Sequence, residues 1–283
     1  MSEFDDVVIL SLIGQEITPE ETQKYLRQVQ ESDGFDIGYF RNARTRINPV
    51  PMKDESGYTH DIELYARLGL HCYNLQKGTN LRFLDIPKYN TEGTRFFSGY
   101  YITSEAHITT TLYALFKLPT GPRATPIEHE RRWEDEVIDD FYKGEMPKWL
   151  TKDELAATKD KGQYYELQES DLLENEWLHL YAEFALYLNW RGFPMKESII
   201  RRSLPLKIKK VIVHTQESGE ESPQLKLKAN NAIFYMSFKR NFDHQSGNYP
   251  VEYQAIVRKT MDRKPGHIRL EVQSWAGTDL FLL

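Results

Sequence analysis

The stretch that most constrains the fold runs from Asp61 to Ala106. Its first part carries apolar residues at spacings of four and three, which lie on one face of an amphipathic helix: Leu64, Leu68, Cys72 and Leu75. Gly78 suits the C-terminus of this helix, because glycine readily adopts the left-handed conformation found there. Strand-like segments follow around Leu81 and from Phe96 to Ala106. A helix followed directly by antiparallel strands predicts an α+β unit in which the helix lies across a sheet.

The flanking segments extend this unit. Thr109 to Leu118 has the alternation of a third strand. Upstream, Thr18 and Glu21 form a capping box, which predicts a helix over about Pro19 to Gln30. The segment from Phe35 to Met52 contains two prolines, and proline cannot donate to a sheet ladder. We therefore expect that segment to be either irregular or an edge strand.

A second capping box, from Thr125 to Glu128, predicts a helix that runs to about Lys143 and is closed by Gly144. This helix would carry a run of carboxylates, which raises the question of a metal site: Glu134, Asp135, Glu136, Asp139 and Asp140. No histidine stands at a ligand spacing among them, so the pattern favours a solvated helix face.

The second half of the chain repeats the order of helix and strands. Met146 to Ser170 is rich in lysine and acids, which predicts a linker. A long helix is predicted from Asp171 to about Trp190. Strands are then predicted from a β-rich run over 206–215, an apolar run over 232–238 and alternating apolar residues over 225–229, 251–257 and 268–272. Asn230-Asn231 is expected to form a tight turn or a bulge.

The two long helices share a local pattern. Leu64-Tyr65-Ala66 in the first compares with Leu180-Tyr181-Ala182 in the second, and each opens a helix that is followed only by strands. We therefore expect two helix-on-sheet units in tandem. The predicted division is an N-terminal extension with a short helix (1–58), a first unit (59–145), a linker (146–170) and a second unit (171–283).

Composition restricts the compartment and the partners. The 42 acids and 36 bases give a net charge of -6, which argues against a nucleic-acid binder. Cys72 is the single cysteine, so no disulfide forms within the chain, and this fits the cytoplasm or nucleus. No apolar run approaches the roughly 20 residues that span a bilayer, and the acidic start lacks the basic region of a signal peptide. We expect an intracellular protein without a membrane partner.

No sequence motif points to catalysis. The chain has no phosphate-binding P-loop, no HExxH and no GxSxG, and its eight histidines are scattered. His71 lacks an evident acid or cysteine partner, Cys72 lies on the packing face, and His179 stands among aromatic and apolar residues. We assign no catalytic, cofactor-binding or metal-binding residue, and we expect neither enzyme activity nor a cofactor.

Three segments carry a resemblance to known proteins. Residues 65–90 followed by YYITSEA resemble the helix and first hairpin of plant cystatins. ESDGFDIGYF, ELYARLGLHCYN and LKANNAIFYMSFK resemble a cystatin-related plant group, the male-sterility-five family, also called UPF0725 proteins. The resemblance implies a cystatin/monellin-like α+β fold, a plant source and a role in reproductive development or meiosis.

The resemblance to cystatins raises protease inhibition as an alternative function. Inhibitory cystatins use a free N-terminal glycine, a Gln-x-Val-x-Gly hairpin and a Pro-Trp loop. The corresponding hairpin here, Asn90 to Gly99, has neither Gln nor Val, and the region from Lys117 to Arg123 has no Trp. Gly34 is not preceded by a free tail. We therefore assign no inhibitory residue.

The favoured hypothesis is a non-catalytic regulatory or protein-interaction protein, since β-rich folds offer edges and hairpins to partners. Inhibition of cysteine proteases is the alternative, and binding of a small ligand between helix and sheet is a third class. The sequence leaves the identity of the protein partner and the oligomeric state open.

Overall fold

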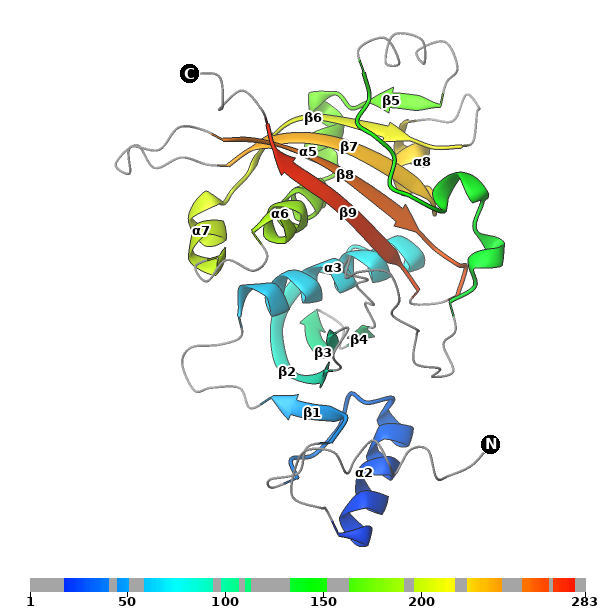
Figure 1. Ribbon diagram of the computed structural model, residues 1–283, viewed down its shortest axis with the longest axis vertical. Coiled ribbons are helices and arrows are strands. Elements are labelled where there is room, and N and C mark those ends of the chain that lie inside the picture. The colour runs from blue at the N-terminus through cyan, green and yellow to red at the C-terminus, as the bar shows by residue number, and fades with distance from the viewer. Residues whose placement is uncertain are drawn as a thin grey trace.

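The computed structural model describes residues 18–40, 45–50, 59–93, 98–106, 110–112, 133–151, 163–190, 196–216, 223–240, 251–264 and 267–277. Two antiparallel sheets enclose a layer of helices between them (Figure 1). Sheet A has the strand order β1-β2-β3-β4, and sheet B has the order β5-β6-β7-β8-β9. Both sheets are antiparallel throughout, which confirms the predicted α+β class.

Sheet A and its helices come from the first part of the chain. The elements are α2 (Pro19–Ser32), β1 (Ile47–Val50), α3 (His60–Lys77), β2 (Phe83–Gly93), β3 (Ser98–Ala106) and β4 (Thr110–Leu112). The helix, turn and two strands predicted for Asp61 to Ala106 are confirmed, and Gly78 ends α3 in the left-handed conformation. The capping box at the start of α2 is also present, with Thr18 and Glu21 bonded reciprocally. β1 contains Pro49 and forms the edge of sheet A, as one reading of that segment predicted.

Sheet B and its helices come from the second part. Two 3-10 turns, η1 (Asp135–Val137) and η2 (Asp140–Tyr142), precede β5 (Tyr164–Glu166). The remaining elements are α5 (Glu169–Glu174), α6 (Leu178–Asn189), α7 (Lys196–Ser203), β6 (Lys207–His214), α8 (Pro223–Lys228), β7 (Ala232–Lys239), β8 (Glu252–Thr260) and β9 (Arg269–Ala276).

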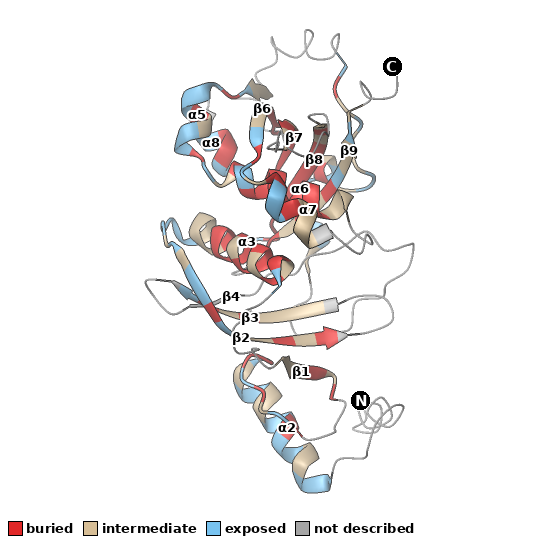
Figure 2. Ribbon diagram, turned by 90° about the vertical axis from the view of Figure 1, so that its left-hand side faces the viewer, coloured by how far each residue is buried: buried red, intermediate tan, exposed pale blue. Residues whose placement is uncertain are grey.

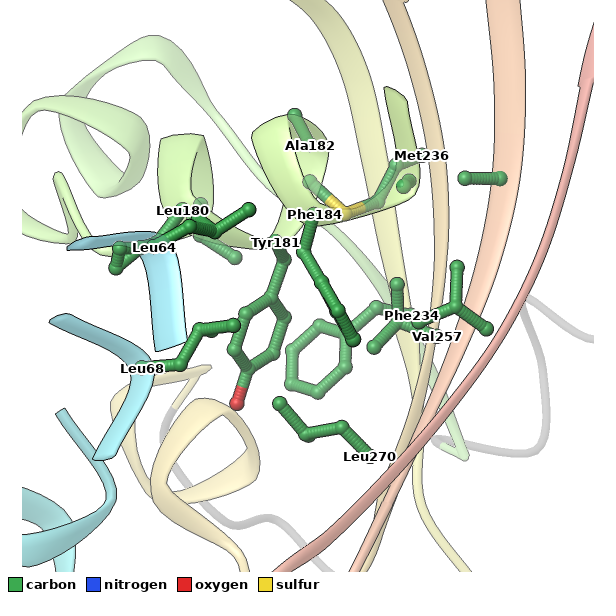
Figure 3. Close-up of a cluster of buried hydrophobic side chains, with 14 of the residues drawn as sticks. Leu64, Leu68, Leu180, Tyr181, Ala182, Phe184, Phe234, Met236, Val257 and Leu270 are labelled. Carbon is green, nitrogen blue, oxygen red and sulfur yellow. The ribbon is translucent and has the colours of Figure 1, made fainter. Parts of the chain in front are cut away.

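The main core lies where α3 and α6 pack against each other between the sheets (Figures 1 and 2). Figure 3 shows Leu64 and Leu68 from α3 facing Tyr181 from α6, with Phe234 of sheet B behind them. The rings of Tyr181 and Phe234 meet edge to face with 5.5 Å between centroids. Each fully buried side chain of this size contributes about 1.5–3 kcal/mol, so this layer is a major source of stability.

The predicted helix ending at Lys143 is wrong over the residues that the structure describes. Residues 133–143 contain two 3-10 turns separated by two extended residues, Ile138 and Asp139, and residues 125–132 lie outside the described chain. Ile138 and Tyr142 are buried against sheet B, and the Asp139 side chain caps the second turn by accepting from the N–H of Phe141. Packing on the sheet thus replaces the regular helix that the local pattern favoured.

The predicted long helix from Asp171 to Trp190 is two helices, α5 and α6. Asn175 separates them: its side-chain amide donates to the carbonyl of Asp171 and accepts from the Trp177 indole. In one continuous helix Leu173 would lie on the same side as Trp177 and Leu180, whereas here it is 73% exposed. An Asx side chain that bonds nearby backbone competes with helix continuation, and here it interrupts the helix.

The strand predicted over Leu225 to Ala229 is also wrong, because Pro223–Lys228 forms helix α8. Alternation over only three apolar residues does not separate a strand from a short helix, and proline fits the first helical turn. The predicted linker contains β5, which pairs with β6, so this segment contributes to sheet B. The strands predicted after Pro205 are otherwise confirmed as β6, β7, β8 and β9.

The segment that follows α2 packs on the face of sheet A opposite α3. Asn90 is buried and donates through its amide to the carbonyls of Gly34 (2.6 Å) and Phe35 (3.1 Å). Gly34 has φ +86°, and a Cβ at this position would lie 2.9 Å from both Ile47 Cδ1 and Tyr101 Cε1. Glycine is therefore required here for its backbone conformation and for its size.

Gly34→Ala is expected to lower the free energy of unfolding by about 1–3 kcal/mol, because it combines a strained backbone with a clash against buried side chains. Urea unfolding of the full chain measures the change. Gly38→Ala is the matched control, since a Cβ at Gly38 would approach only the flexible Gln28 amide, at 3.3 Å. Equal stabilities of the two variants would contradict this role of Gly34.

Candidate functional site

The outer face of sheet B, on the side away from α6, is apolar and crosses three strands. Tyr235 of β7 pairs in register with Ile212 of β6 and Ile256 of β8, so their side chains lie on one face. Four buried residues form the floor of this face: Ile212, Ile233, Tyr235 and Ile256. A sheet face of this kind needs a cover, because water would otherwise contact it.

The cover is an extended segment, residues 133–150, which we call the strap (Figure 1, green). Its only regular elements are η1 and η2. Ile138, Tyr142 and Leu150 are its buried residues, and they pack on the floor of the outer face. Trp149 meets Tyr235 and Trp275 edge to face, with centroids 5.9 and 5.7 Å away.

A side chain of β8 binds the strap backbone. Arg258 in β8 donates to three consecutive carbonyls, those of Lys143 (3.3 Å), Gly144 (2.9 Å) and Glu145 (3.2 Å). Its Nε donates to Glu271 Oε2 at 2.8 Å, and the side chain is only 4% exposed. The planar fork of donors in a guanidinium suits such a multiple contact, which a lysine could not reproduce.

The first residues of the strap are held by a second polar cluster. Asp262 accepts from the N–H of Glu134 (3.1 Å) and from His267 Nδ1 (2.8 Å). Burial raises the pKa of the Asp262 carboxyl, but the hydrogen bonds from His267 and the backbone outweigh burial and lower it. His267 Nδ1 is therefore the donor in this contact, since the ionised carboxylate only accepts. The Trp133 ring stacks on His267, and the Arg269 guanidinium lies 4.1 Å from the centroid of the Trp133 ring.

The far end of the outer face is aromatic. His214 stacks on Tyr164, with 3.7 Å between ring centroids, and meets Phe141 of the strap edge to face. Burial, and secondarily the charge of Lys226, lower the pKa of His214 to about 4. The ring is thus neutral at physiological pH and packs as an aromatic group.

The inner face of sheet B holds a second set of titratable groups. Lys259 in β8 is fully buried, its Nζ has no hydrogen-bond partner in the described chain, and it lies 5.9 Å from the centroid of the Phe234 ring. Burial lowers the pKa of Lys259 to about 8, lowers that of His71 to about 3 and raises that of Cys72 to about 12. Each shift favours the uncharged form, as desolvation requires.

Ion pairs join the two central helices. Glu183 of α6 lies 3.1 Å from His60 Nε2 and 3.2 Å from Arg67 Nη1, both of α3. Burial raises the pKa of Glu183, but the hydrogen bond from His60 and the charge of Arg67 together lower it. These contacts fix α3 against α6 at the centre of the molecule.

The structure places the residues discussed from sequence as follows. Cys72 is buried, as its helical face predicted, and His71 is buried with its Nε2 3.3 Å from the Tyr181 hydroxyl. His179 is exposed on α6. The acidic run lies in the strap, where Glu134 pairs with Lys264 and Asp135 with Arg269. In the described residues, no three His, Cys, Asp or Glu side chains are placed to hold a metal ion.

Sequence reasoning did not identify Arg258, Lys259 or Glu183. A signal for the first two existed: Arg258 and Lys259 are adjacent in a strand, so one of them had to point into each face of the sheet. Glu183 stood on the helix that carried the repeated pattern, but its partners lie more than a hundred residues away.

No described helix combines the length and hydrophobicity needed to span a bilayer.

These features define an α+β protein of two antiparallel sheets, joined through packed helices, whose second sheet holds an extended segment on its outer face. A family model described as Protein MS5 matches residues 146–270. UPF0725 protein At4g28920 of Arabidopsis thaliana is 52% identical, over 92% of this chain and 91% of the relative. UPF0725 protein At3g44770 of the same plant is 38% identical, over 90% of this chain and 82% of the relative. The chain belongs to the MS5 family of UPF0725 proteins.

A solved structure shares the fold. The crystal structure of MS5 from Brassica napus matches with a TM-score of 0.55 at 23% identity, covering 78% of this chain and 99% of that one. The names of these relatives state no enzymatic activity.

Proposed function

We propose that this protein is a non-catalytic protein-interaction module that acts in plant reproductive development, in the cytoplasm or nucleus. One observation carries the proposal: the outer face of sheet B binds an extended polypeptide, the strap, through buried side chains and through Arg258 on three carbonyls. A surface that holds one extended segment in this way has the chemistry to hold another. The partner is therefore a protein, and neither nucleic acid nor membrane is needed.

The developmental part of the proposal rests on family membership. The family description is Protein MS5, and the sequence resembles the male-sterility-five group. Protease inhibition is not carried forward. In inhibitory cystatins the first hairpin and an N-terminal glycine reach into a protease, whereas here Asn90 is buried against the carbonyl of Gly34. Asn90 and Gly34 therefore bond to each other inside this protein, so neither is presented to a protease.

We also propose that the chain contains two cystatin-like units in tandem. α3 packs on sheet A and α6 packs on sheet B, and the repeated Leu-Tyr-Ala residues of both helices are buried in one core. The proposed second unit begins at β5, earlier than the sequence placed it, because β5 pairs with β6. Residues 1–58 remain the proposed extension, although β1 pairs with β2 of the first unit.

Proximity labelling in plant reproductive tissue tests the proposed function. The wild-type bait is expected to label a reproducible set of proteins that a tag-only bait does not label. Arg258→Lys keeps the charge but loses the forked contact with the strap, and it is expected to change that set. Arg201→Lys is the control, because Arg201 is half exposed on α7 and, among the described residues, pairs with Glu197 alone. No reproducible partner, together with turnover of a metabolite by the purified protein, would place the protein in another functional class.

A further inference from the structure

The strap has the features of a bound ligand on the outer face of sheet B. It forms no ladder with the sheet, and three of its carbonyls are satisfied by a side chain, Arg258. Its buried anchors, Ile138, Tyr142 and Leu150, stand four and eight residues apart and reach the apolar floor. The Tyr142 hydroxyl accepts from the N–H of Gln216 at 2.7 Å. These are contacts that a peptide in trans could make equally well.

Charge complementarity defines which kind of peptide fits. Residues 133–150 contain six acids and two lysines. The body of the protein meets the first two of these acids with basic groups: Lys264 Nζ lies 2.9 Å from Glu134 Oε1, and Arg269 Nη1 lies 3.3 Å from Asp135 Oδ1. Arg269 also lies over the Trp133 ring. The rim of the surface is therefore selective for an acidic segment with an aromatic residue beside its first acids.

We propose that the outer face of sheet B is the binding site for an acidic, aromatic-containing extended segment of another protein, and that the strap occupies this site as an intramolecular competitor. This inference rests on the proposed function and names the chemistry of its partner. Because the strap is tethered, its effective concentration is high, and an external segment binds only when the strap is loosened or outcompeted.

The test uses the full chain and a fluorescent peptide of residues 133–150 as the probe. Ile138→Ala removes a buried anchor of the strap and leaves the sheet unchanged, whereas Val137→Ala alters the neighbouring exposed residue. The peptide is expected to bind Ile138→Ala at least tenfold more tightly than it binds wild type or Val137→Ala. A peptide with Lys in place of Glu134 and Asp135 is expected to bind Ile138→Ala at least tenfold more weakly than the native peptide.

Several results would overturn the inference. Equal binding of the peptide to wild type and Ile138→Ala, or no binding to either, removes the proposed site. Concentration-dependent dimers of Ile138→Ala in light scattering would assign the site to the strap of a second copy. If Ile138→Ala does not fold, as judged by circular dichroism, Tyr142→Phe takes its place, since it loses only the hydroxyl that accepts from Gln216. Reproducible partners in proximity labelling without peptide binding would leave the proposed function standing and remove this inference alone.

Discussion

Arg258→Met is expected to lower the free energy of unfolding by about 3–5 kcal/mol, the range for breaking a buried charged contact. The variant leaves the carbonyls of Lys143, Gly144 and Glu145 without their donor, and it leaves Glu271 without its ion-pair partner. Chemical denaturation measures the change in stability. Hydrogen exchange is expected to increase first over residues 133–150, because the strap loses its central attachment.

Arg201→Met is the matched control for this prediction. Arg201 is half exposed and forms an i,i+4 pair with Glu197, a contact worth only a few tenths of a kcal/mol. Removing it is expected to change stability by about 0.5 kcal/mol or less. If Arg258→Met were no more destabilising than this control, the guanidinium would not be what holds the strap to sheet B.

Lys259→Met is expected to raise the free energy of unfolding at pH 7 by roughly 3 kcal/mol. The lowering of the Lys259 pKa from 10.5 to about 8 corresponds to this order of magnitude at 1.36 kcal/mol per unit. Methionine has a similar length and buries no charge, and Lys259 Nζ has no hydrogen-bond partner to lose in the described chain. The contact with the Phe234 ring offsets part of the cost of burial.

The gain from Lys259→Met should depend on pH. Below pH 8 both the folded and unfolded wild-type chains carry the proton on Lys259, and the folded state bears the full cost of the buried charge. Between pH 8 and about 10.5 the folded state releases this proton while the unfolded state retains it, so wild-type stability rises relative to the variant. The difference between wild type and variant is therefore largest at pH 7 and closes by about pH 10.5.

Urea unfolding of wild type and Lys259→Met across this pH range measures the difference in their free energies of unfolding. The titration of Cys72 and the tyrosines contributes to both proteins and largely cancels in this difference. Lys228→Met on the exposed surface of α8 is the control, with an expected change of about 0.5 kcal/mol or less. If Lys259→Met is less stable than wild type, or if the stability difference between them does not change with pH, other groups in the core compensate the charge of the Lys259 amine.

Local sequence signals were reliable where they agreed with the packing. The Thr18–Glu21 capping box and Gly78 define the start of α2 and the end of α3, because caps act within a single turn of chain. Four strands of sheet B followed from β-rich, apolar or alternating segments of five to ten residues, whereas β5 lay in the predicted linker. The same kinds of signal failed over the described part of Thr125–Lys143, where contacts with sheet B decided the backbone, and at Asp171–Trp190, where a local side-chain hydrogen bond did. In the first case residues 133–143 lie on sheet B as part of the strap, and in the second the Asn175 side chain interrupts the helix.

The candidate site could not be predicted in the same way. Arg258 lies 113 to 115 residues from the carbonyls that it binds, and neither end of this contact forms a recognisable motif. The acidic residues of the strap were expected on a solvated helix face, yet Glu134 and Asp135 pair with Lys264 and Arg269 at the margin of the site.

The sequence by itself determined the class of fold, the helix and strands of Asp61 to Ala106, strands β6 to β9 of sheet B and the family, because these depend on periodicity and short motifs. The tertiary structure alone decided that α3 packs against α6, that Lys259 lies buried with no hydrogen-bond partner for its amine among the described residues, and that the strap covers the outer face of sheet B. The physical reason is that burial and long-range hydrogen bonds outweigh the fraction of a kcal/mol per residue with which local propensity favours one backbone conformation.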